Sequence, residues 1–120
     1  MSLTAALLAG CSSSSSTDTT VALETTDTAA VTTSVVEIKL IVGENTGPDM
    51  KQTVPLGASV RITVTNPNGA DEIHVHGYDI STGEMAKGQE AVIEFVASSA
   101  GTFDLESHVS EEIMLILTVE

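Results

Sequence analysis

The stretch SVRITVTN, residues 59–66, decides the fold because its polar and apolar side chains alternate strictly from Ser59 to Thr65. Val60, Ile62 and Val64 lie on one face of an extended chain, and the polar residues between them lie on the other. A period of two is typical of a β-strand that buries one face in a core. The strand should end where NPNGAD, residues 66–71, begins, since Asn, Pro, Gly and Asp favour turns.

Short runs rich in Val, Ile and Thr recur on both sides of this stretch, with turn-forming residues between them. No window of ten or more residues has a convincing helical period. We expect strands at 35–42, 51–56, 59–66, 72–78, 91–97, 102–108 and 113–119. About seven strands at this spacing predict an all-β fold, a small antiparallel β-sandwich of two sheets.

Two of these strands carry all three histidines of the chain. In EIHVHGY, residues 72–78, Ile73 and Val75 are expected to point into the core. The opposite face then carries Glu72, His74, His76 and Tyr78. In TFDLESH, residues 102–108, Phe103 and Leu105 are expected inside. Their opposites are Asp104, Glu106 and His108.

The His-x-His pair is a weak metal motif when taken alone. His74 and His76 project from the same face, roughly 6 to 7 Å apart at their Cα atoms, and imidazole is a common ligand of copper and zinc. The alternative interpretation is that both are only solvated polar positions, because an alternating strand must place polar residues outside.

The order of the elements resembles the cupredoxin family, the copper proteins related to plastocyanin. The resemblance rests on a valine-rich strand that ends in Asn66, a histidine-bearing strand, GTFDLES at 101–107, then His108, and Met114 early in the last strand. It implies a Greek-key sandwich in which the strands bearing the histidines lie close together. The sandwich could then gather His74, His76 and His108, with Glu106 as a candidate fourth ligand, around copper or, alternatively, zinc.

The resemblance also implies what the domain lacks. Ser107 falls where the family has its copper-binding cysteine, and without a thiolate there is no blue-copper centre. Met114 occupies the family's axial-ligand region, but Met is a common core residue and we expect it to be buried. Tyr78 or Asp79 could orient a histidine ring.

The chain is strongly acidic, with 17 Asp and Glu against 4 Lys and Arg and a formal net charge of −13. Such a surface repels nucleic acid and anionic lipid headgroups, so neither is an expected partner. The neighbouring pairs Asp71 and Glu72, and Glu111 and Glu112, are expected to be solvated. No nucleotide-binding or catalytic motif is present, so the sequence predicts that the protein is not an enzyme.

The N-terminus resembles a bacterial lipoprotein signal, with Leu8, Ala9 and Gly10 before Cys11, the only cysteine. This implies a signal segment at 1–11 that ends in a lipidated Cys11. Residues 12–34, rich in Ser and Thr, are predicted to be a disordered tether, and 35–120 to be the folded domain. The first ten residues contain no Lys or Arg, unlike most signal peptides. An unlipidated N-terminus with a free thiol is the alternative.

Together these features predict a monomeric, lipid-anchored, extracytoplasmic domain that binds copper or a similar divalent metal for capture, delivery or sensing. Its only membrane contact would be the anchor. Two alternatives remain open. One is a metal-free module that binds a protein partner at the cell surface, and the other is an electron carrier with an atypical copper site.

Overall fold

The computed structural model describes residues 34–120, so the predicted signal segment, Cys11 and the tether lie outside the described residues. Eight strands and no helix form in this part of the chain, and therefore none of it forms a helix that could cross a membrane. The strands are β1 (Val35–Ile41), β2 (Lys51–Val54), β3 (Ser59–Thr65), β4 (Ile73–Val75), β5 (Ile80–Ser81), β6 (Glu90–Val96), β7 (Gly101–Ser107) and β8 (Ile113–Val119).

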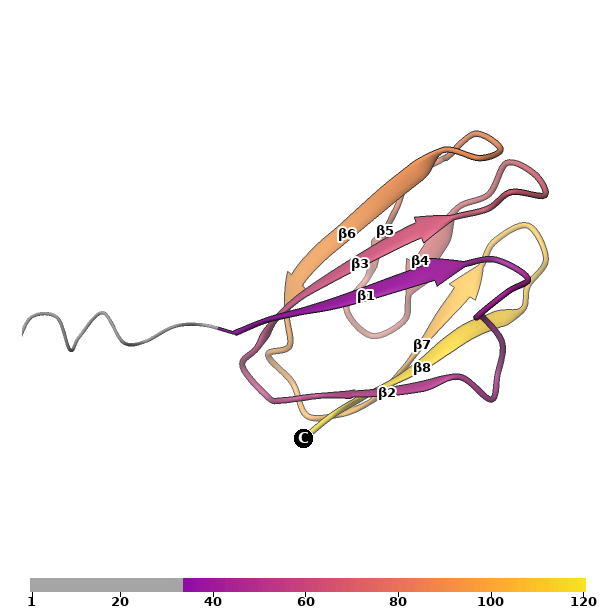
Figure 1. Ribbon diagram of the computed structural model, residues 1–120. Helices are drawn as coiled ribbons and strands as arrows, with labels where there is room; N and C mark the ends of the chain where they lie inside the picture. The colour runs from indigo at the N-terminus through magenta and orange to yellow at the C-terminus, as the bar shows by residue number, and fades with distance from the viewer. Residues whose placement is uncertain (1–33) are drawn as a thin grey trace, which may run out of the picture. The chain divides into compact units, whose positions relative to one another are not determined.

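The strands form two sheets that lie in separate layers (Figure 1). One has the order β1-β3-β6 and the other the order β2-β8-β7-β4-β5. The predicted all-β sandwich is confirmed. Two edge pairs, β1 with β3 and β2 with β8, run parallel, which differs from the antiparallel pairing expected throughout. Parallel pairing is possible here because neither pair is connected by a hairpin, which would make it antiparallel.

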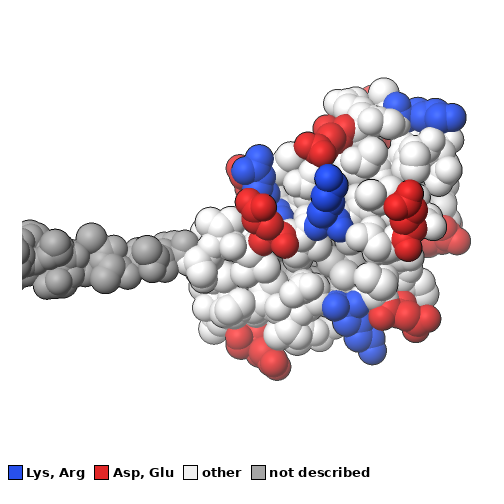
Figure 2. Space-filling model, in the orientation of Figure 1, with Lys and Arg blue, Asp and Glu red and all other residues white. Residues whose placement is uncertain are grey.

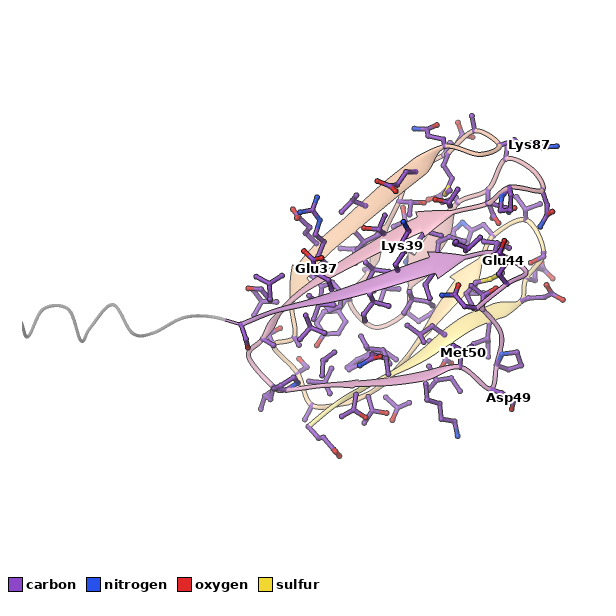
Figure 3. The ribbon with its side chains drawn as sticks, in the orientation of Figure 1. Glu37, Lys39, Glu44, Asp49, Met50 and Lys87 are labelled. Carbon is purple, nitrogen blue, oxygen red and sulfur yellow. The ribbon has the colours of Figure 1, made fainter. Side chains whose placement is uncertain are left out.

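The core lies between the sheets and follows the predicted alternation. Val60, Ile62 and Val64 of β3 are at most 1% exposed. Ile73 and Val75 of β4 are completely buried in the facing sheet. The outer face of β1 instead carries Glu37 and Lys39, both exposed (Figure 3). The period of two therefore identified correctly which side of these strands faces the core.

The histidine-bearing strand is shorter than predicted, since β4 ends at Val75. Gly77 and Asp79 then adopt positive φ angles of 88° and 53°, and the chain turns into the short strand β5, which the sequence analysis missed. The turn ends the alternation. Tyr78 consequently packs against Phe95 and Phe103, with ring centroids 4.7 and 4.6 Å away, and its hydroxyl donates to the Ser99 carbonyl. The placement of Tyr78 beside the histidines was wrong.

Charged groups are distributed unevenly between the two sheets. On the face shown in Figure 2, Lys and Arg stand among Asp and Glu. Lys39 lies on β1, Arg61 on β3, Lys51 on β2 and Lys87 in the turn before β6. The strands β4, β5, β7 and β8 carry no Lys or Arg. β4, which carries His74, and β7, which ends just before His108, therefore have no cationic side chain, and β7 adds the carboxylates of Asp104 and Glu106.

Candidate metal centre

Antiparallel pairing of β4 with β7 builds the candidate site. His74 lies directly opposite Glu106 in this pairing, so both side chains emerge on the outer face of the five-stranded sheet. The His74 ring has its centroid 4.8 Å from that of His76 and 5.4 Å from that of His108. The three predicted histidines therefore form one cluster, with His74 in the middle.

Each imidazole has a carboxylate beside it. His76 Nε2 lies 2.8 Å from Glu106 Oε2, which is a hydrogen bond. His108 Nδ1 is 3.7 Å from Glu72 Oε2, and His74 Nε2 is 4.0 Å from Asp79 Oδ1. The predicted partnership of Asp79 with a histidine is thus a loose contact, because Asp79 is 93% exposed. Glu72 is an additional acidic neighbour that the sequence analysis did not identify as a ligand, although it lies two residues before His74 on the same face.

His74 is the most enclosed of the three rings. Its side chain is 21% exposed, against 52% for His76 and 48% for His108. Its Nδ1 atom is buried and has no hydrogen-bond partner among the described residues. A buried polar atom without a partner is unusual, since such atoms are nearly always hydrogen-bonded or bound to a ligand. This ring nitrogen could therefore bind a metal ion only after the ring turns to expose it.

The donor set and the ring spacing fit a first-row metal ion. Two imidazoles on one such ion, with metal–nitrogen bonds of about 2.0 Å, have centroids roughly 4.5 to 5 Å apart. The observed separations lie close to that range. Among residues 34–120, however, no three His, Cys, Asp or Glu side chains already stand in an arrangement that would hold a metal. Binding would require the rings to rotate and His76 to exchange its hydrogen bond with Glu106.

Solvent reaches the cluster along one side. An open groove of about 600 Å³ is lined by His108 and Glu72, together with Met85 and Val109. Two members of the histidine and carboxylate cluster therefore face a space through which an ion could approach without any opening of the fold.

The predicted solvated position of Asp71 was wrong. Its residue is only 6% exposed, and its carboxylate accepts hydrogen bonds from Ser107 Oγ at 2.7 Å and Asn66 Nδ2 at 2.9 Å. Asp71 pairs with Met85 in an isolated bridge just before β4, and it lies on the same side of the chain as the buried Ile73 two residues later. Met114 is 3% exposed and belongs to the core, as predicted.

Comparison with solved structures shows a cupredoxin-like fold. The chain is similar to the blue copper oxidase of Nitrosomonas europaea (TM-score 0.61, 22% identity, 72% of this chain and 39% of that one). It is also similar to dithionite-reduced auracyanin of Roseiflexus castenholzii, with a TM-score of 0.58 and 16% identity over 71% of this chain and 97% of that one. A third match is the apo form of a copper-binding protein, with a TM-score of 0.57 and 20% identity over 72% of this chain and 88% of that one. No protein-family model and no curated protein matches the sequence.

The same matches correct the expectation that the protein is not an enzyme. The fold also forms parts of multicopper oxidases and of the copper nitrite reductase of Nitrosomonas europaea, which are enzymes. The missing catalytic motifs were therefore an insufficient basis for that expectation, because this fold occurs both in enzymes and in other proteins. The chain spans 39% of the oxidase and 42% of the reductase.

Proposed function

We propose that this domain binds one divalent copper or zinc ion through His74, His76 and His108, with Glu106 as the fourth ligand. The observation that carries the proposal is the clustering of the three imidazoles around His74, whose buried Nδ1 has no partner among the described residues. Imidazole and carboxylate donors suit Cu(II) and Zn(II). Residues 34–120 contain no cysteine, so we propose no blue-copper centre.

The role we propose is capture, delivery or sensing of the metal at an extracytoplasmic membrane surface, with Cys11 as the lipid anchor. Two features support it. His108 lines an open groove, and the side chains of His76 and His108 are about half exposed, so exchange of the ion with solvent or with a partner is feasible. The carboxylates around the histidines also attract cations.

Titration of the full chain with Cu(II) and with Zn(II) tests the proposal. All samples carry Cys11→Ser, so that the thiol cannot bind the metal. We expect one ion per chain and, in the double variant His74→Ala/His76→Ala, an affinity at least about 100-fold lower, which corresponds to roughly 3 kcal/mol. Electron paramagnetic resonance of the copper complex should show a tetragonal nitrogen and oxygen site without a thiolate signature.

Matched carboxylate variants make this test specific. Glu106→Gln should weaken binding, whereas Glu37→Gln, which removes the same charge from the outer face of β1, should not. A chain that binds neither metal, or binds equally well without His74 and His76, would contradict the proposal. Absence of binding to either metal would favour the metal-free interaction module.

A further inference from the structure

The buried polar residues of the domain form a single network beneath the histidine cluster. Asn66, Asp71 and Ser107 are the buried polar or charged residues among those described, at 7%, 6% and 0% exposure. Asn66 Nδ2 donates to Asp71 Oδ2, and Ser107 Oγ donates to Asp71 Oδ1. The backbone N–H of Glu72 also donates to Asp71 Oδ1, at 2.8 Å. The Asp71 carboxylate therefore joins the start of β4 to the end of β7.

Ser107 extends this network into the turn that carries His108. Its hydroxyl accepts hydrogen bonds from the N–H groups of Val109, at 3.2 Å, and Ser110, at 3.0 Å. The N–H of His108 donates to the Glu72 carbonyl at 2.9 Å. The backbone on both sides of His108 is therefore attached, directly or through Ser107, to the segment at Asp71 and Glu72.

Two backbone hydrogen bonds also close this turn, from the Ser107 N–H to the Glu112 carbonyl and from the Glu111 N–H to the Ser107 carbonyl, but neither joins it to the segment at Asp71 and Glu72. Residues 108–112 are all exposed, so no apolar packing fixes the His108 ring, and β7 itself ends at Ser107. A hydrogen bond between a hydroxyl and a buried carboxylate is charge-assisted and stronger than a neutral one. It is also costly to break, because the remaining buried carboxylate loses a donor.

We propose that Ser107 and Asp71 are positioning residues that hold His108 next to His74 and thereby complete the metal site. This inference rests on the proposed function. It assigns a role to the serine that replaces the family's cysteine in the resemblance: Ser107 would not bind the metal but would set the place of the third imidazole.

Removing the hydroxyl tests this role. In the full chain with Cys11→Ser, Ser107→Ala should still bind Cu(II) through His74 and His76. The affinity should fall by about 10- to 100-fold, as is typical when a residue that orients a metal ligand is lost. The nitrogen hyperfine structure of the paramagnetic resonance spectrum should change from the pattern of three coordinated imidazoles to that of two. Ser107→Thr, which keeps the hydroxyl, should retain three.

A core variant separates positioning from general loss of stability. Val54→Ala removes two methyl groups from a fully buried position on β2, which β8 separates from β7. It should lower the melting temperature while leaving the affinity and the three-nitrogen spectrum unchanged. If Ser107→Ala does not fold, Asp71→Asn provides the same test, because it keeps the side-chain shape but removes the charge from the hydrogen bond.

The outcomes distinguish this inference from the function on which it rests. A parent chain that binds no metal contradicts the proposed function itself. If the parent chain binds through three imidazoles, and the Ser107→Ala or Asp71→Asn variant keeps both the affinity and all three nitrogens, only the role of the network is overturned. If Val54→Ala also lost coordination by the third imidazole, the positioning role would be overturned as well, because the loss would then follow from lower stability alone.

Discussion

Replacement of Leu105 by Ala is expected to lower the free energy of unfolding by about 3 kcal/mol, within the range for a buried Leu→Ala change. Leu105 is 0% exposed and lies in the middle of β7, paired with Val75 on one side and Leu115 on the other. Its loss would leave a cavity between the sheets where little rearrangement is possible. A domain of this size has a stability of roughly 4 to 13 kcal/mol, so this is a large fraction.

Leu56→Ala is the matched control for this prediction. Leu56 lies in the turn after β2 and is 53% exposed, so the same chemical change should alter stability by less than about 0.5 kcal/mol. Urea denaturation of both variants measures the difference. Equal effects at the two positions would show that the core does not lie where the structure places it.

Gly77→Ala is expected to destabilise the domain by about 3 to 5 kcal/mol through two separate effects. Gly77 has a φ of +88°, and a side chain there costs roughly 1 to 2 kcal/mol of backbone strain. A Cβ atom would also lie 2.7 Å from Cδ1 of Phe103 and 2.9 Å from its Cε1. Phe103 has little freedom to move away, because its ring already packs against Tyr78.

Gly83 separates the two effects. It has a φ of +70°, but an added Cβ would meet nothing within 4 Å. Gly83→Ala should therefore show the strain alone, at about 1 to 2 kcal/mol. Combining Gly77→Ala with Phe103→Ala should remove the clash, so the two changes should cost less together than the sum of each alone. Strict additivity in thermal or urea denaturation would contradict a direct contact between Gly77 and the Phe103 ring.

The turn around Gly77 also affects the candidate site, because it follows His76 immediately. The N–H of His76 donates to the Asp104 carbonyl, and the chain then reverses into β5. Without this reversal the strand would continue and Tyr78 would lie beside the histidines. Sequence periodicity could not predict the reversal, since HVHGYD continues to alternate through Tyr78.

The parts of the site that could be predicted are those that depend on a single strand. His74 lies opposite the core because Ile73 and Val75 must be buried, and the alternation fixes this locally. The proximity of His108 was an expectation from resemblance, not from periodicity. It depends on which strands are neighbours, and the pairing of His74 with Glu106 supplies that information.

The sequence by itself determined the all-β class, the core faces of β3 and β4, and the absence of a thiolate donor after residue 11. These properties follow from composition and from the two-residue period of an extended chain, which act over a few residues. Only the tertiary structure decided the parallel edge pairs, the burial of Asp71 and the hydrogen bond from Ser107 to it. Those features join residues far apart in the sequence, such as Ser107 and Asp71 or Lys51 of β2 and Ile116 of β8. Burial that makes such a contact favourable exists only after the two sheets have packed together.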